Sequence, residues 1–220
     1  KTSLDSYVSV LMLENKVVTK KVLERAGISV PGGYEYTSPE AGMADYRMYA
    51  GKPVVIKPKS TNFGLGITIL KHNYDETDFK AALQIAFEHD NTVLIEKFIP
   101  GREFRIFIIN DEVVGILHRV PANVTGDGVL NIGQLIDRKN EDPLRGKGYR
   151  TPLEKIRKGR EEEMFLKQQG MDFNTVPKEG EVVYLRENSN ISTGGDSIDF
   201  TDDIDDSYKA IAVEAAKALN

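Results

Sequence analysis

The sequence predicts a mixed α+β fold, because short strand-like runs lie on both sides of helical segments. The run KPVVIKP is too short and too rich in β-branched residues for a helix, and it predicts a buried strand at 53–57. Residues 76–89 repeat apolar side chains at helical spacing, and TVLIEKF after them predicts another strand. With 220 residues, the chain can bury one sizeable core or form two small lobes.

The composition excludes several classes of protein. The chain has no cysteine, which excludes a disulfide scaffold and thiolate chemistry, and its 3 histidines are too widely spaced for a histidine-rich metal centre. A formal net charge of -5 argues against sequence-independent binding of nucleic acid. No apolar run approaches the ~20 residues that cross a bilayer, and the amino terminus lacks the plan of a signal peptide. We therefore expect no nucleic-acid partner, no membrane partner and a cytoplasmic location.

A helix, a strand and a β-hairpin are also predicted before Pro121. Residues 17–26 place apolar side chains on one helical stripe, with Asn15 as the expected cap and Gly27 as the expected stop. ITILKH predicts a strand that returns after the loop STNFGLG. REFRIFIINDEVVGILH alternates apolar and polar residues and predicts a β-hairpin that turns at Asn110 and Asp111.

The pattern changes from Pro121 onward. PANVTGDGVLN and KNEDPLRGKGYRTP are rich in turn residues, so we expect a mobile or ligand-facing loop there. Helical periodicity returns at 153–169, VVYL predicts a strand at 182–185, and the Ala-rich residues 208–219 predict a final helix.

Two charged stretches are expected to lie in solvent. The acidic residues of 196–206 predict a solvated loop that caps the last helix, with a metal site as the alternative. A basic group is expected to form a solvated face, with an anion-facing loop as the alternative. Its members are Arg138, Lys139, Arg145, Lys147 and Arg150.

Lys57 is the first candidate for a functional residue. It ends a predicted buried strand and is followed by the glycine-containing turn 60–66. A lysine ammonium beside free backbone N–H groups would hold phosphate oxygens, so this segment has the outline of a nucleotide site. A tight hairpin between two strands is the structural alternative. The Walker A pattern GxxxxGK[ST] is absent.

The segment EKFIPGREFR, which begins at Glu96, is a second candidate. Pro100 and Gly101 break a strand there, and such a crossing can offer backbone groups and an apolar wall to a flat heterocycle. The carboxylate of Glu103, seven residues after Glu96, could accept hydrogen bonds from ribose hydroxyls. An ordinary connection between two strands is the alternative.

Three strings in this order, ENKVVTKKVLERAGISVPGG, VVIKPKSTNFGLGI and VLIEKFIPGREFRIFII, resemble the ATP-grasp superfamily. The resemblance implies an incomplete ATP-grasp fold, in which two α/β lobes clamp a nucleotide and a large loop and helix region is inserted. It implies an amino-terminal helical segment and linker at 1–50 and a glycine-flap lobe at 51–100. The second lobe with the inserted region would then occupy 101–220.

The same resemblance implies a role for individual residues. Phosphate binding is assigned to Lys16 and Lys57. The flap over the phosphates would comprise Asn62, Phe63, Gly64, Leu65 and Gly66. Adenine would be lined by Glu96, Lys97, Phe98 and Ile99, and the ribose would be bound by Glu103. The candidates for stabilising the transferring phosphoryl group are Arg105, Arg119 and Arg186, each with a structural or solvent-facing ion pair as the alternative.

The downstream strings narrow the resemblance. RVPANVTGDGVLNIGQLI, NEDPLRGKGY and VVYLRENSNISTGGDSIDFTDD resemble the ligase part of bifunctional glutamate-cysteine ligase/glutathione synthetases and, as the runner-up, cyanophycin synthetases. The former implies that ATP phosphorylates the free carboxylate of γ-glutamylcysteine and that the amine of glycine attacks the acyl phosphate. A cyanophycin synthetase would instead extend a polymer of aspartate and arginine.

The resemblance also implies residues that this sequence does not contain. Relatives of this type hold Mg²⁺ through an Asp strand and a Glu-x-Asn strand, which we expect beyond Asn220, so no metal ligand is assigned here. Glu187, Asn188 and Asn190 are expected to order a loop or contact substrate, with ligation of Mg²⁺ as the alternative. We expect the chain to be a fragment, covalently joined in the full-length protein to a glutamate-cysteine ligase domain. A non-catalytic ATP-grasp-derived binding module is the alternative, and a homo-oligomer is left open.

Overall fold

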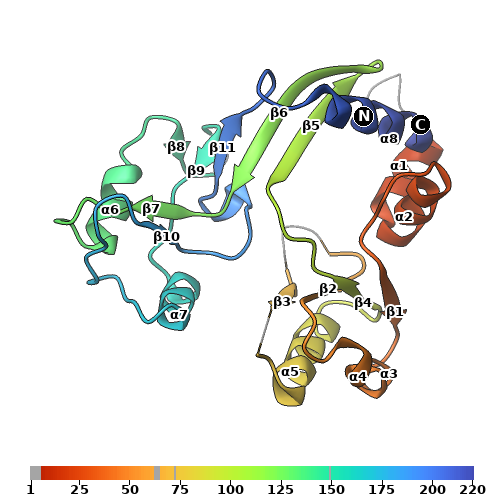
Figure 1. Cartoon of the computed structure of the whole chain (residues 1–220), viewed down its shortest axis with the longest axis horizontal. Helices are drawn as coiled ribbons and strands as arrows, with labels where there is room; N and C mark the ends of the chain where they lie inside the picture. Colours follow the sequence, from red (N-terminus) through yellow and green to blue (C-terminus); the bar gives the residue numbers. More distant parts are fainter. Residues whose placement is uncertain (1–5, 62–64, 72, 149) are drawn as a thin grey trace. The chain divides into compact units, whose positions relative to one another are not determined.

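The computed structural model describes residues 6–61, 65–71, 73–148 and 150–220 (Figure 1). The chain forms two compact units. The first contains the residues up to Gly101, together with 106–114 and 203–220. The second contains 102–105 and 115–202.

The first unit combines a sheet with helices. Its elements are α1 (Tyr7–Glu14), α2 (Lys16–Arg25), β1 (Gly33–Tyr36), α3 (Pro39–Ala44), α4 (Tyr46–Tyr49), β2 (Val54–Pro58), β3 (Thr68–Leu70), α5 (Glu76–Phe87), β4 (Val93–Lys97) and α8 (Asp206–Leu219). The sheet has the order β1-β4-β2-β3, and neighbouring strands are antiparallel. Figure 1 shows α3, α4 and α5 together on one side of this sheet.

The two faces of this sheet differ in chemistry. Val54 and Ile56 on β2 and Ile95 on β4 point to the helical side, where they form the core with Phe79 of α5. Because side chains alternate along a strand, the residues between them point to the opposite face. That face carries Glu96, which pairs with Val55 in the register. The pleat of β2 and β4 therefore separates an apolar core from a charged surface.

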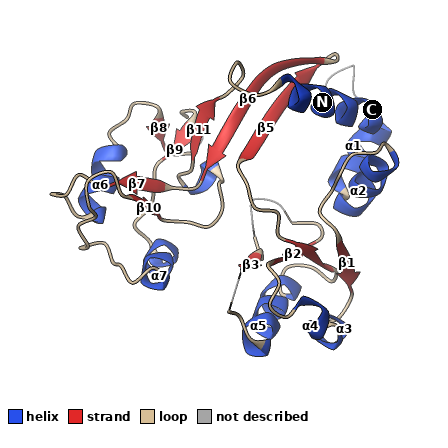
Figure 2. Cartoon of the chain, in the orientation of Figure 1, coloured by secondary structure: helices blue, strands red, loops and turns tan. Residues whose placement is uncertain are grey.

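The second unit is built from short elements around its own core. Its elements are β7 (Asn123–Thr125), α6 (Ile132–Lys139), β8 (Arg145–Gly146), β9 (Leu153–Glu154), α7 (Arg160–Gln168), β10 (Val182–Tyr184), the 3-10 helix η1 (Ile191–Thr193) and β11 (Asp196–Asp199). The hairpin of β5 (Glu103–Ile109) and β6 (Glu112–Val120) contributes residues to both units, and β11 pairs with β6 (Figure 2). The buried core includes Ile132, Leu166 and Leu185.

Local sequence signals are confirmed in the first half of the chain. The side chain of Asn15 caps α2 by accepting from the N–H groups of Val17 and Val18, and Gly27 follows the helix with φ 79°. The hairpin turns at Asn110 and Asp111, whose φ values of 53° and 50° are those of a type I′ turn.

The loop predicted from Pro121 onward is wrong for 123–125 and 145–146, which form β7 and β8, and α6 occupies 132–139 between the two turn-rich strings. Asn131 caps this helix, and the side chain of Gln134 bonds back to the N–H of Asn131, so a capping box begins the helix directly after the turn-rich segment. The helix expected at 153–169 is shorter than predicted, because 153–154 form β9 and α7 begins only at Arg160.

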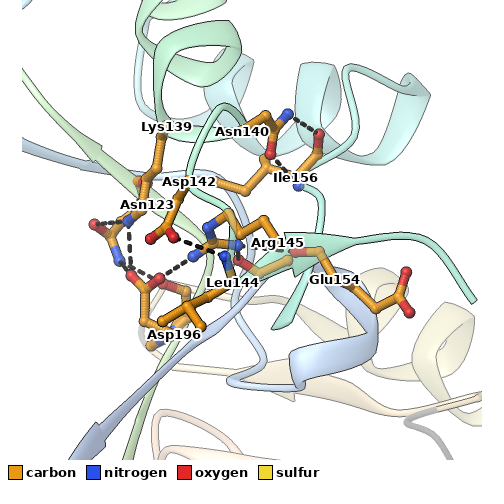
Figure 3. A network of polar contacts seen from close by, with 11 residues as sticks. Asn123, Lys139, Asn140, Asp142, Leu144, Arg145, Glu154, Ile156 and Asp196 are labelled. Atoms are coloured by element: carbon orange, nitrogen blue, oxygen red, sulfur yellow. Dashed lines mark hydrogen bonds and ion pairs between the residues drawn. The ribbon is translucent and has the colours of Figure 1, made fainter. Parts of the chain in front are cut away.

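The charged stretches are also not fully solvated, which corrects a second prediction. Asp196 accepts from Lys139 and Arg145, so the acidic and basic stretches pair with each other (Figure 3). Arg145 is only 4% exposed, and its guanidinium also donates to the carbonyls of Glu154 and Gly194. This network ties β8, β9, β11 and α6 together. The predicted cap of the last helix is confirmed, because the side chain of Asp205 accepts from Ser207 at the start of α8.

Candidate nucleotide site

Three charged side chains meet on the polar face of the first unit's sheet. Glu96 is 3% exposed, and its two carboxylate oxygens are shared between two lysines. The ammonium of Lys20 on α2 lies 2.8 Å from Oε1, and that of Lys57 on β2 lies 2.5 Å from Oε2. Burial alone would raise the pKa of Glu96, but the hydrogen bonds and charges of the two lysines outweigh it and hold the pKa below its usual value. Glu96 is therefore a buried anion between two cations.

A glycine makes room for this carboxylate. Gly33 on β1 is paired with Glu96, and a Cβ at Gly33 would lie 2.2 Å from the carbonyl oxygen of Ile95 and 2.9 Å from Cγ of Glu96. A side chain at this position would collide with the backbone of β4. The close approach of the two strands thus requires glycine at position 33.

Lys16 lies at the base of the turn that follows β2. Its ammonium donates to the carbonyls of Thr61 at 2.8 Å and Lys59 at 3.0 Å, and lies 3.5 Å from that of Pro58. Burial and, second to it, the charge of Lys57 lower the pKa of Lys16. The two predicted phosphate-binding lysines, which come from α2 and β2, are therefore close enough to repel each other.

The same turn is held from its other side by Asp90, which the sequence analysis did not identify. Its carboxylate accepts from the N–H of Ser60 at 2.7 Å and from the N–H of Thr92 at 3.0 Å. Burial would raise the pKa of Asp90, but these backbone hydrogen bonds lower it. The ammonium of Lys16 binds carbonyls of the turn, and the carboxylate of Asp90 binds one of its amides. Together these two side chains fix where the turn begins.

Only part of the predicted flap lies among the described residues. The hydroxyl of Thr61 donates to the carbonyl of Leu65, and Gly66 has φ 71°. A Cβ at Gly66 would lie 2.7 Å from the side chains of Pro58 and His89, so glycine is required there. Asn62, Phe63 and Gly64 lie outside the described residues.

The connection after β4, predicted to line adenine, is partly occupied by the protein's own hydrogen bonds. The N–H of Lys97 donates to the carbonyl of Gly32 at 2.8 Å, and the N–H of Phe98 donates to the carbonyl of Pro53 at 3.0 Å. The side chain of Ile99 is 57% exposed and offers an apolar surface. The adenine role of this connection stays a proposal.

Glu103 and Arg119 are brought together in the second unit. The guanidinium of Arg119 lies 3.1 Å from the carboxylate of Glu103, which also accepts from the hydroxyl of Ser189 at 2.5 Å. Arg119 donates further to the carbonyl of Ser189 and to the side chain of Asn190, both at 2.9 Å. Asn188 accepts from the hydroxyl of Thr193, so these asparagines order the loop before η1.

The other two arginine candidates differ from Arg119. Arg186 is committed to α7, where its guanidinium pairs with Glu161 and lies 2.6 Å from Glu162, which is 1% exposed. This arrangement favours the structural ion pair for Arg186. Arg105 is an exposed residue of β5.

Among the residues that the structure describes, there is no group of three or more His, Asp and Glu side chains that could hold a metal ion. The helices within the described ranges include none long and apolar enough to cross a membrane.

Comparison with known proteins identifies the family. A family model describing the RimK-like ATP-grasp domain matches residues 13–138, which is more than half of the chain and includes Lys16, Lys57, Glu96 and Glu103. The chain belongs to the RimK-like ATP-grasp family. The superfamily and fold expected from the sequence are confirmed.

Similar proteins cover the whole chain. The glutathione biosynthesis bifunctional proteins GshAB of Desulfotalea psychrophila and Clostridium perfringens are 61% and 56% identical over 219 residues. A crystal structure of a bifunctional glutathione synthetase from Pasteurella multocida is 51% identical over all of the chain, with a TM-score of 0.65. The chain spans 28% of the two curated relatives and 30% of that solved chain.

A more distant structure shows the fold alone. The D-alanine–D-alanine ligase of Bacillus anthracis is 20% identical, and the match covers 96% of this chain and 50% of that one, with a TM-score of 0.56. This match supports the fold assignment and carries no statement about substrates.

Proposed function

We propose that this chain is the nucleotide-binding part of a longer, bifunctional glutathione-synthesising ligase. The substrates would be ATP with Mg²⁺, γ-glutamylcysteine and glycine, and the full-length protein would carry a glutamate-cysteine ligase domain as well. The identities of 61% and 56% to GshAB proteins support this assignment. A cytoplasmic location fits these substrates.

The observation that carries the proposal is the convergence of Lys16 and Lys57 at one turn. The ammonium of Lys16 on α2 donates to carbonyls of the turn at 58–61, and Lys57 lies on β2 directly before that turn, where its charge acts on Lys16. Phosphoryl transfer spreads negative charge over several oxygens, which cations and backbone amides stabilise. We infer that Lys57 and Lys16 bind the phosphates, with Lys16 exchanging a carbonyl of the turn for a phosphate oxygen.

The remaining roles follow from the positions of the other side chains. The connection 96–99 would contact adenine, and Glu103 would contact the ribose. Arg119, held by Glu103 and the loop at 189–190, would stabilise charge on the transferring phosphoryl group together with Arg105. The γ-phosphoryl group moves to the carboxylate of γ-glutamylcysteine, and the glycine amine then displaces phosphate from the acyl phosphate. Each step is assisted by positioning and charge, without a covalent enzyme intermediate.

Replacement of Lys57 tests the phosphate site. In the full-length protein, we expect Lys57→Met to abolish measurable ATP binding in isothermal titration, because one of the two cations proposed to bind phosphate oxygens is lost. Lys52→Met is the matched control, since Lys52 is an exposed lysine of the same unit whose side chain, among the described contacts, bonds only to the carbonyl of Met48. Unchanged ATP affinity in Lys57→Met would refute the phosphate assignment.

Substrate choice tests the ligase assignment against its alternatives. Phosphate release by the full-length protein should require γ-glutamylcysteine plus glycine. Release with aspartate or arginine and a polymer primer would instead identify a cyanophycin synthetase. ATP binding without release on either substrate set would identify a non-catalytic binding module.

A further inference from the structure

Lys20 of α2 pairs with Glu96 on the polar face of the first sheet, and the proposed phosphate site does not use it. Lys20 lies one helical turn after Lys16 on α2, so the two side chains project from the same side of that helix. Lys16 reaches the carbonyls of the turn, whereas Lys20 reaches Glu96. The side chain of Lys20 is 22% exposed, equal to that of Lys57 on the other oxygen of Glu96.

Glu96 needs a cation at all times. Its carboxylate is almost completely buried, and a buried carboxylate without a counterion is strongly unfavourable. The proposed function requires Lys57 to interact with a phosphate, and this inference rests on that proposal. A phosphate beside Lys57 competes for its ammonium and adds negative charge near Glu96. Without another counterion, Glu96 would hold Lys57 back and repel the phosphate.

We propose that Lys20 is a positioning residue that remains paired with Glu96 and so frees Lys57 to bind the phosphates of ATP. Lys20 acts through Glu96 and Lys57 and does not touch the nucleotide. Its geometry suits this role, because it occupies Oε1 while Lys57 occupies Oε2, and one lysine can leave while the other stays.

ATP titration of variants of the full-length protein tests this inference. Lys20→Met should weaken ATP binding by about tenfold or more, since the remaining lysine must neutralise a buried carboxylate alone. Lys20→Arg should retain the affinity within about threefold, because it keeps the charge and its donors can reach the same oxygen. Arg25→Met removes one positive charge from an exposed position of the same helix and should leave the affinity unchanged.

A double variant separates this role from general damage to the fold. If Lys20 acts through the charge of Glu96, then Glu96→Gln and Lys20→Met/Glu96→Gln should bind ATP equally, because no buried charge remains to be neutralised. This comparison holds even if Lys20→Met alone does not fold. A further loss of more than about threefold in the double variant would overturn the proposal.

The same series distinguishes failure of this inference from failure of the proposed function. Wild-type affinity in Lys57→Met overturns the phosphate assignment and this inference with it. Lost affinity in Lys57→Met with wild-type affinity in Lys20→Met overturns only the role of Lys20.

Discussion

Each unit of the chain contains one acid shared between two cations, but the two clusters are built differently. In the second unit, Asp196 is paired with Arg145, whose side chain is 1% exposed and bonds two backbone carbonyls, and with Lys139, which also donates to Asn123 (Figure 3). In the first unit, Glu96 is paired with Lys20 and Lys57, each 22% exposed.

The difference lies in how many donors of each cation are already used. The ammonium of Lys139 has three donors and makes three hydrogen bonds, so its capacity is filled by the protein. Within the part of the chain that the structure describes, the contacts seen for the Lys57 ammonium are confined to Glu96, and the side chain reaches solvent. A cation whose donors are all bonded to the protein stabilises the fold, whereas a cation with donors that are not bonded to the protein can bind an anion. The Asp196 network is therefore interpreted as structural and the Glu96 cluster as part of a site.

The largest expected effect separates the two clusters by stability. Arg145→Met should lower the free energy of unfolding by about 3–5 kcal/mol, because it removes the donor to Oδ1 of Asp196 and to two carbonyls of a buried network. Lys57→Met should cost only about 1 kcal/mol, since Lys20 stays on Glu96 and the lost pair is partly exposed. Urea unfolding measures both changes.

Arg138→Met is the control for that comparison. It removes an exposed pair with Asp127, and we expect a loss below about 1 kcal/mol. If Arg145→Met and Lys57→Met lowered the free energy of unfolding equally, the interpretation of the Asp196 network as structural and the Glu96 cluster as part of a site would be contradicted.

A smaller effect sharpens the account of the Glu96 cluster through its backbone. Gly33→Ala should destabilise the protein by about 1–3 kcal/mol, because the added methyl group overlaps the backbone of β4 beside Glu96. Gly32→Ala is a matched control, since a Cβ at Gly32 meets nothing within 4 Å. Thermal unfolding of the two variants should therefore differ, and similar melting temperatures would show that β1 can move away from β4.

The smallest expected effect concerns pH. The lysines lower the pKa of Glu96 in the folded protein below its value in the unfolded chain, about 4.3. Its contribution to stability is then present above that unfolded pKa and is lost as the pH falls through the folded pKa. The stability advantage of the wild type over Glu96→Gln should shrink on acidification from pH 7 to pH 3, as followed by urea unfolding. A constant difference over this range would show that Glu96 gains nothing from its two cations.

Local chemistry explains what the sequence could predict. The cap at Asn15, the turn at Asn110 and Asp111 and the strand around Ile56 depend on neighbouring residues, and each was found where expected. Helix α6 was missed although Ile132, Leu135 and Ile136 have helical spacing, because the turn residues directly before it dominated the pattern.

Contacts between residues far apart in the chain could not be predicted from the sequence. Asp196 and Arg145 lie 51 residues apart, and Lys20 and Glu96 lie 76 apart, so no local pattern shows that they pair. Lys57 and Lys16 were identified through the order of family strings. For Lys20, the sequence offered only its spacing of four residues from Lys16, which places the two on the same side of a helix. No sequence pattern indicated that Asp90 bonds to the turn at Ser60.

The alternation of β2 and β4 has a consequence for how this chain can change over evolution. Deleting or inserting one residue within Val54–Pro58 would turn the strand over, carrying the ammonium of Lys57 into the space of Ile56 and the isoleucine out among the lysines. The two strands can tolerate single substitutions, but the insertion or deletion of one residue would disrupt the core and the charged cluster together. Variation in length should therefore gather in the connections, while these two five-residue strands keep a fixed count.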